Sequence, residues 1–226
     1  MIILAAQKGN IEILKNLIDK GANIEKTTPK GNSPLIGAIY SNQHQCLKVL
    51  IELGANKNAK YYHSSGYQSP PIVLSSSKKH SECIRILIDS NVNINEVDTK
   101  GNNALMVSAF KGNLNCVHIL LKTPIDINAT NQNGYTALEI ATEKQNFLCA
   151  REIKQRTREL TVHAVHSDSA GFINQGETSP EILIGEPVPD THTTTSRARL
   201  HNLRGMLSNG YTGDIGGPDT KGRPPS

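Results

Sequence analysis

Tryptophan is absent from this chain of 226 residues, and aromatic residues of all kinds make up only 4% of it. Long hydrophobic runs are absent too, because no apolar stretch approaches the roughly 20 residues that span a bilayer. The first six residues are apolar, but no basic residue precedes them and a polar, periodic segment follows at once. We therefore expect neither a signal peptide nor a membrane partner.

Cysteine is scarce as well, with four residues in the whole chain and no export signal ahead of them. Secreted proteins use cysteine for disulfides, whereas reducing compartments keep thiols free. We therefore expect a cytoplasmic protein.

A strong excess of charge of one sign is also missing, since the formal net charge is +4 and the pI about 8.8. Residues 1–160 hold 19 Lys and Arg against 13 Asp and Glu, while residues 161–226 hold 5 against 7. A nucleic-acid-binding domain typically has a pI above about 9 and a clustered basic stripe. The mildly basic body therefore points to a protein partner with an acidic surface rather than to nucleic acid.

An internal repeat is present instead. A loop series begins at Gly21, Gly54, Asn91 and Pro124, which are 33, 37 and 33 residues apart. A series of turns and a series of apolar runs share this register; the turns are 33–35, 70–72, 103–105 and 136–138, and the runs are 14–18, 47–51, 84–88 and 117–121. The three series together establish a period of 33 residues, with four extra residues ahead of the turn of the third repeat.

The period and the turns resemble the ankyrin family, whose repeat of about 33 residues opens its first helix with a Thr-Pro-Leu-His-x-Ala turn. The turns here read Ser-Pro-Leu-Ile, Pro-Pro-Ile-Val, Asn-Ala-Leu-Met and Thr-Ala-Leu-Glu, so no copy keeps the His. The resemblance covers residues 1–157 and implies an all-α solenoid of helix-turn-helix units with hairpin loops. It places a repeat domain at 1–160, with repeats at about 1–29, 30–62, 63–99, 100–132 and 133–157.

Individual residues agree with such units. Pro34 suits the first turn of a helix, where its missing N–H would have no partner anyway. Small residues such as Ala38 let neighbouring first helices lie close together. The second helix is amphipathic, because Leu47 and Leu50 share one face and Lys48 lies on the other. One such unit cannot bury its apolar face alone, so the units must stack.

The two ends of the array differ from its middle. Met1 falls on the proline position of the turn, so the first repeat lacks its hairpin and begins with an apolar helix. We expect exposed apolar surface there, or a chain that begins upstream of Met1. The second helix of the fifth repeat, expected at 146–158, replaces its apolar face with Arg151, Glu152, Lys154, Gln155 and Arg156. This change predicts a C-terminal cap.

The four cysteines raise the question of a zinc site; they are Cys46, Cys83, Cys116 and Cys149. Their spacing is the repeat spacing, and the first repeat has Ile13 at the same place. Equivalent residues of stacked helices lie about 10 Å apart, beyond the roughly 7 Å between Cα atoms that a disulfide tolerates. Zinc ligands must converge to about 2.3 Å from one ion. The cysteines are therefore predicted to form a core column, and we expect no metal and no cofactor.

Partner binding in ankyrin proteins uses two strips of surface, the ends of the first helices and the hairpin tips, and the resemblance implies the same here. Five of the six tyrosines and Phe110 fall on these strips, with lysines beside them. Lysine is expected at any exposed position, so the tyrosines are the stronger signal, because Tyr buries a large area at low entropic cost. The predicted protein-binding residues are Tyr40, Tyr61, Tyr62, His63, Tyr67, Lys78, Lys100, Asn102, Phe110, Lys111, Tyr135 and Lys144.

The segment 161–226 is rich in Ser, Thr, Gly and Pro and has no sustained periodicity. This composition predicts a low-complexity, disordered tail. Two pieces of it are candidate linear motifs: the apolar patch 181–184, and 197–207, where three leucines at helical spacing alternate with arginines.

Catalysis finds no support in the sequence, because no nucleophile has a positioned base and no glycine run continues into a phosphate-binding Gly-Lys-Ser/Thr. We therefore predict a monomeric, non-enzymatic scaffold that binds a partner protein through the concave face and hairpin tips. The alternative is a secreted or targeted effector or adaptor of an intracellular bacterium, whose repeats bind a host protein and whose tail carries a signal. Deletion of 161–226 distinguishes the two.

Overall fold

The computed structural model describes residues 1–63 and 65–169, with side chains described as far as residue 162. Helices dominate these residues, and one pair of short strands lies among them. In chain order the elements are α1 (Ile2–Lys8), α2 (Ile11–Asp19), α3 (Pro34–Tyr40), α4 (His44–Glu52), β1 (Tyr61–Tyr62), β2 (Gln68–Ser69), α5 (Pro71–Lys78), α6 (Ser81–Asp89), α7 (Ala104–Phe110), α8 (Leu114–Leu121), α9 (Ala137–Glu143) and α10 (Phe147–Ser169). The candidate motifs at 181–184 and 197–207 lie outside the described residues.

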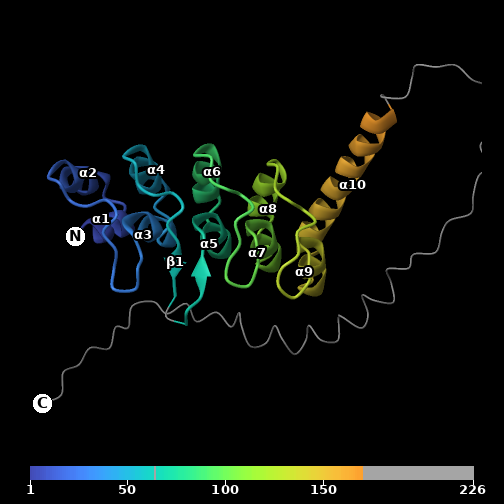
Figure 1. The fold of residues 1–226 in the computed structure, drawn as a ribbon, viewed down its shortest axis with the longest axis horizontal. Coiled ribbons are helices and arrows are strands. Elements are labelled where there is room, and N and C mark those ends of the chain that lie inside the picture. The colour runs from blue at the N-terminus through green and yellow to red at the C-terminus, as the bar shows by residue number, and fades with distance from the viewer. Residues whose placement is uncertain (64, 170–226) are drawn as a thin grey trace, which may run out of the picture. The chain divides into compact units, whose positions relative to one another are not determined.

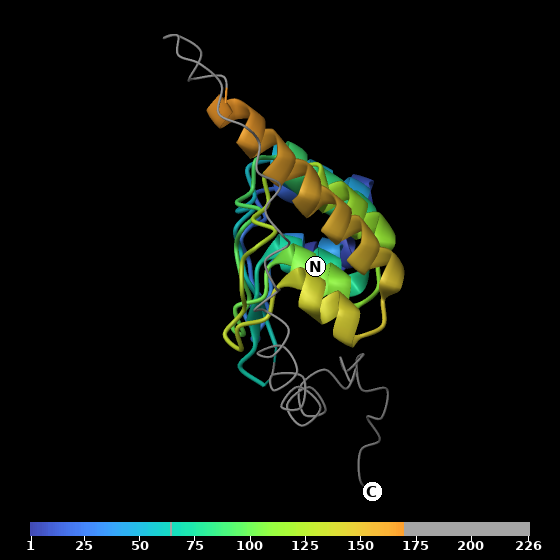
Figure 2. The same ribbon diagram turned by 90° about the vertical axis from the view of Figure 1, so that its right-hand side faces the viewer.

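The helices stack as pairs in two rows (Figure 1). One row contains α1, α3, α5, α7 and α9, the other contains α2, α4, α6, α8 and α10, and consecutive members of each row are in contact. The loops that join one pair to the next project to one side of both rows (Figure 2). This arrangement confirms the predicted all-α solenoid of helix-turn-helix units.

Three of the first helices, α3, α7 and α9, begin at side-chain caps. The Ser33 hydroxyl accepts a hydrogen bond from the N–H of Ile36, and Pro34 occupies the first turn of α3 as predicted. Asn103 caps α7, and Thr136 forms a reciprocal capping box with Glu139 at the start of α9. Such caps satisfy backbone donors that have no partner within the helix, and each typically contributes about 1 kcal/mol.

The core lies between the two rows and between successive repeats. Ala38, Leu47 and Leu50 are fully buried, while Lys48 is exposed, so the predicted faces of the helices are confirmed. All four cysteines are free and buried, as expected of a core column. The Cys83 sulfur lies 3.9 Å from Oδ1 of Asn42 in the preceding repeat. The cysteine position therefore faces backwards along the solenoid.

Polar side chains tie each repeat to its predecessor. His80 Nδ1 donates to the Ile39 carbonyl at 2.8 Å, and Asn146 Nδ2 donates to the Ala109 carbonyl at the same distance. In the loops, the N–H of Asn56 donates to the Glu25 carboxylate of the preceding repeat at 2.7 Å. These bonds satisfy groups that the short helices leave without partners.

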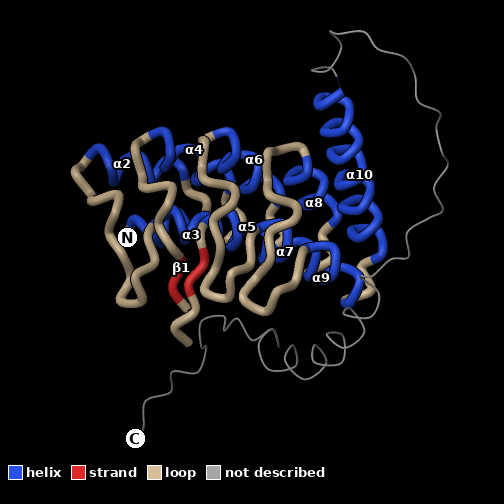
Figure 3. The backbone as a smooth tube through the Cα atoms, turned by 45° about the vertical axis from the view of Figure 1, so that its right-hand side comes forward, coloured by secondary structure: helices blue, strands red, loops and turns tan. Residues whose placement is uncertain are grey.

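The four extra residues of the third repeat lengthen one hairpin. Strands β1 and β2 pair antiparallel within it, with Tyr61 opposite Ser69 and Tyr62 opposite Gln68. Figure 3 shows the strands within a loop that reaches beyond its neighbours. The insertion therefore places two consecutive tyrosines on a rigid strand.

The first repeat leaves apolar surface exposed, as expected for this end of the array. Leu4 is 53% exposed and Ile13 is 50% exposed. Their equivalents Val107 and Cys46 in later repeats are at most 2% exposed. These positions face backwards along the solenoid, and no earlier repeat covers them here.

The last helix differs from the prediction in two respects. It continues to Ser169, past the boundary at residue 160 that the sequence predicts. Hydrogen bonds from Gln155 and Arg156 to Glu159 stabilise the turn that precedes this extension. Its cap is also less polar than predicted, because Phe147 is 68% exposed and Leu148 is 56% exposed. Among the described residues, no helix combines the length and the apolar character that crossing a membrane requires.

Candidate protein-binding surface

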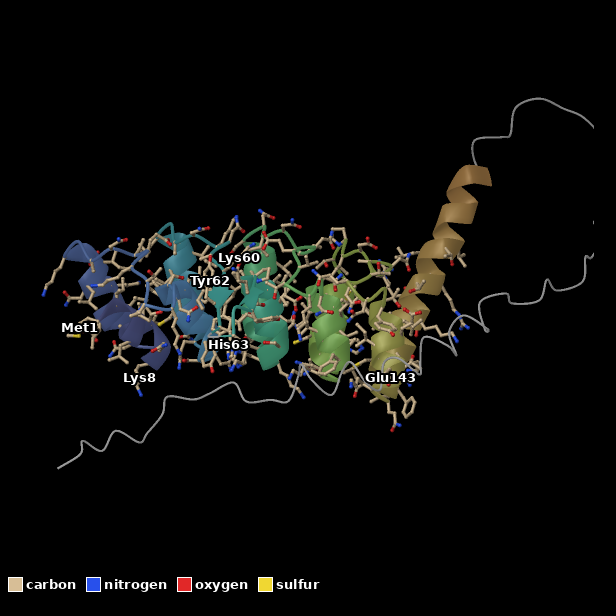
Figure 4. All side chains as sticks on the ribbon, turned by 60° about the horizontal axis from the view of Figure 1, so that its bottom comes forward. Met1, Lys8, Lys60, Tyr62, His63 and Glu143 are labelled. Carbon is tan, nitrogen blue, oxygen red and sulfur yellow. The ribbon has the colours of Figure 1, made fainter. Side chains whose placement is uncertain are left out.

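The ends of the first helices form a row that carries two aromatic side chains and several lysines. We call Tyr40, Lys78, Phe110, Lys111 and Lys144 the first-helix strip. All five side chains are half-buried, and they stand at the C-terminal ends of α3, α5, α7 and α9. Figure 4 labels Lys8 and Glu143, which mark the two ends of this row. The structure thus brings together the first-helix residues that the sequence selects.

Lysines of the strip reach back to aromatic rings of the preceding repeat. Lys78 Nζ lies 3.7 Å from the centroid of the Tyr40 ring, and Lys144 Nζ lies 4.9 Å from that of Phe110. Lys111 Nζ lies 5.8 Å from the same Phe110 centroid. These distances are within the roughly 6 Å range of cation–π attraction. The rings therefore hold the ammonium groups at defined places on the surface.

The turn after α5 adds another lysine to this region. Lys79 has a φ of 64°, in the left-handed region, and the equivalent residues of the other repeats, Gly9, Asn42, Gly112 and Gln145, also have positive φ. Burial, followed by the charges of Lys79 and Lys78, lowers the pKa of Lys111. The ion pairs found among the described residues include none of Lys78, Lys79 and Lys144. The strip is therefore a region of concentrated positive charge.

The β1–β2 hairpin adds aromatic groups beside the strip. The Tyr61 ring packs 5.9 Å from the Tyr40 ring and 6.4 Å from His63, and burial raises the pKa of Tyr61. Tyr62 is the most exposed of these tyrosines at 40%, and its backbone pairs with Asn32. Tyr62 therefore presents its ring to solvent while its main chain is fixed.

Other predicted site residues hold the hairpins together. The Tyr67 hydroxyl donates to the Asp98 carboxylate at 2.8 Å, and Asn102 donates to both oxygens of that carboxylate. Asn102 is 7% exposed and also accepts from Asn131 Nδ2. We therefore exclude Asn102 from the binding surface as a correction, because its polar groups serve the hairpins. Asp98 itself is missing from the prediction, since nothing in the sequence marks it as buried.

Lys100 and Tyr135 occupy neighbouring hairpins and are both half-buried. The Lys100 N–H donates to Asp98, and its carbonyl accepts from the N–H of Gln132 in the next hairpin. The Tyr135 N–H donates to the Asn131 side chain. The backbones of both residues thus belong to the hairpin network, while their side chains remain partly accessible.

Open grooves lie on the second-helix row. One of about 580 Å³ runs between α6 and α8 and includes Arg85, Asp89 and His118 in its lining. Beside it, His118 contacts Glu152 at 3.2 Å, and bonds from Arg151 and then His118 lower the pKa of that carboxyl. Charges of both signs pair with each other here. This row therefore has the character of a solvated surface rather than of a cationic, aromatic one.

Metal and thiol chemistry find no support in the described part of the chain. No group of three or more His, Cys, Asp or Glu among these residues is arranged to hold a metal ion. Burial raises the pKa of the Cys83 thiol to about 12 and that of Cys116 to about 11. A raised pKa disfavours the thiolate, which is the reactive and metal-binding form of cysteine.

Curated proteins match parts of this chain. Glycerophosphocholine phosphodiesterase gde1 of Schizosaccharomyces pombe is 33% identical over 41% of the chain and 8% of its own length. E3 ubiquitin-protein ligase KEG of Arabidopsis thaliana is 30% identical over 45% of the chain and 6% of its own length. Ankyrin repeat and SOCS box protein 3 of Bos taurus is 30% identical over 41% of the chain and 17% of its own length. The chain thus spans less than a fifth of each of these three relatives.

A family model covers more of the sequence than any of these pairwise matches. The model described as "Ankyrin repeats (3 copies)" matches residues 1–61 and 72–163. The interval between the two matches contains most of the lengthened β1–β2 hairpin. Repeat period, paired helices and sequence match agree, and the chain belongs to the ankyrin repeat family.

Proposed function

We propose that this protein binds a partner protein through the first-helix strip and the exposed Tyr62 ring of the β1–β2 hairpin. Ankyrin repeats are in general protein–protein interaction modules, and relatives such as the SOCS box protein contain them. The observation that carries the proposal is the placement of Lys78 and Lys144 over aromatic rings of the preceding repeat.

The physical advantage of this placement is entropic. A free lysine loses up to about 2 kcal/mol of rotamer entropy when a partner fixes it. Lys78 is already held against Tyr40, so part of that loss is incurred on folding. Tyr62 adds a large ring with few rotatable bonds. A partner that carries acidic groups around an apolar side chain fits this combination.

The names of two relatives describe enzymes, but the matched segments cover 8% and 6% of those proteins. The family model matches ankyrin repeats in this chain, and such repeats are typically non-enzymatic. We propose that this chain likewise acts by binding, in which case its activity needs a partner rather than a substrate.

Charge reversal on the strip tests the proposal. The full chain and a Lys78→Glu/Lys144→Glu variant are used as baits in a cell lysate, and captured proteins are quantified by mass spectrometry. The matched control is Lys122→Glu/Lys154→Glu, which makes the same charge change at exposed positions of the second-helix row. We expect partners to be lost with the strip variant and retained with the control. Equal recovery with both variants would overturn the proposal.

The hairpin is tested separately with Tyr62→Ala. Tyr62 is preferred to Tyr67, because loss of the Tyr67 hydroxyl would break the bond to Asp98 and disturb the fold. We expect the same partners to be recovered in lower amounts, while circular dichroism stays unchanged. Undiminished recovery would confine the binding surface to the first-helix strip.

A further inference from the structure

We propose that the partner segment bound by the first-helix strip is an acidic peptide in the polyproline II conformation, with carboxylates at every third residue. The inference rests on the proposed function, since it assumes that the strip is the binding surface. It names the chemistry and the spacing of what that surface recognises.

The spacing of the lysines supports this choice. Lys78, Lys111 and Lys144 are equivalent residues of three successive repeats, each 33 residues after the last. Neighbouring helices pack at about 8–10 Å, so the strip offers about one cationic position per 8–10 Å. A polyproline II helix has three residues per turn and rises about 3.1 Å per residue. Its residues i, i+3 and i+6 therefore share one face at about 9.3 Å intervals.

Other regular conformations match the row less well. Side chains on one face of a β-strand recur about every 6.7 Å, which falls out of step with a period of 8–10 Å. An α-helix with acidic residues seven positions apart repeats about every 10.5 Å, just beyond the 8–10 Å range of helix packing, whereas 9.3 Å lies within it.

The charge distribution sets the length of the bound segment. Repeats three to five each contribute a lysine to the row, and Lys79 adds a second ammonium in the third. The second repeat has Ser41 at the corresponding position, and Glu143 stands beside Lys144 at the far end. Three carboxylates, opposite Lys78, Lys111 and Lys144, are therefore the number that the row accommodates.

Synthetic peptides test the spacing directly. Fluorescein-labelled (Glu-Pro-Pro)₃ is compared with a peptide of the same composition whose three glutamates are contiguous, by fluorescence anisotropy with the full chain at low salt. We expect the spaced peptide to bind at least about threefold more tightly. Replacement of Lys111 or Lys144 by Ala should weaken its binding by about two- to fivefold, the range of one exposed ion pair. Lys122→Ala, on the other row, should leave it unchanged.

Several results would overturn the inference. Equal affinity for the spaced and contiguous peptides would show that the spacing of the carboxylates does not affect binding. Tighter binding of an alanine-rich helical peptide with glutamates at i, i+7 and i+14 would show that the strip prefers an α-helix to polyproline II. Tighter binding of an RNA oligonucleotide of equal charge would show that the strip prefers nucleic acid to an acidic peptide. If no acidic peptide binds but the lysate partners still depend on Lys78 and Lys144, this inference fails and the proposed function stands.

Discussion

The ammonium nitrogen of Lys78 lies 3.7 Å from the centre of the Tyr40 ring, although the two residues belong to different repeats. The same ring lies 5.9 Å from the Tyr61 ring of the lengthened hairpin. Tyr40 therefore joins the end of α3, the end of α5 and strand β1. One aromatic side chain connects both parts of the proposed binding surface.

This contact predicts a measurable coupling between the two side chains. Cation–π pairs at exposed sites contribute about 0.5–1 kcal/mol. We expect a double-mutant cycle of Tyr40→Leu and Lys78→Met to give a coupling of that size in urea unfolding. Tyr40→Phe keeps the ring and serves as the control, so the coupling to Lys78 should persist in that background. A coupling near zero would show that the ring does not hold the lysine.

His80 predicts a pH dependence of stability. Burial, followed by the charge of Lys78, lowers its pKa, while the hydrogen bond to the Ile39 carbonyl acts in the opposite direction. With the pKa depressed in the fold, unfolding takes up a proton. The free energy of unfolding is therefore highest above a pH of about 6.5, which is the pKa of histidine in the unfolded chain. It falls as the pH decreases below that value.

His80→Asn isolates this effect. Asn146 occupies the equivalent position and donates to the preceding repeat in the same way, so the variant should keep the bond without a titrating group. We expect urea midpoints between pH 5 and pH 8 to vary less for the variant than for the parent protein. An unchanged pH profile would assign the dependence to other groups.

Lys79 predicts a stabilising substitution. Its φ of 64° is strained for a residue with a Cβ atom, whereas two other repeats have glycine at this turn. Relief of the left-handed penalty should make Lys79→Gly more stable by about 1 kcal/mol. Lys79→Ala removes the same charge but keeps the strain, so it should give no such gain. Equal midpoints for the two variants in urea unfolding would contradict the argument.

Sequence periodicity predicted those features that depend on one repeat resembling the next. Cys83 could be placed in the core because its spacing is that of the repeats, and Tyr40 could be placed at a helix end by the same register. Contacts between unlike residues were not predictable in this way. The bond from Tyr67 to Asp98 joins an inserted segment to the following hairpin, and the burial of Asn102 depends on that carboxylate.

The end of α10 illustrates the same limit. Its extension to Ser169 begins with exposed residues such as Leu160 and Val162, so no buried apolar period marks it in the sequence. Periodicity therefore predicts buried faces well, and predicts the ends of exposed helices poorly.

The backward-facing position of the second helix predicts opposite outcomes for one substitution at two equivalent sites. Ile13 is 50% exposed in the first repeat, whereas Cys46 is 1% exposed because the first repeat covers it. Ile13→Lys should therefore change the free energy of unfolding by less than about 0.5 kcal/mol, as surface substitutions usually do. Cys46→Lys buries an unpaired charge and should cost several kcal/mol, or abolish folding. Urea unfolding followed by circular dichroism measures both, and a large loss of stability in Ile13→Lys would mean that the first repeat is covered in solution.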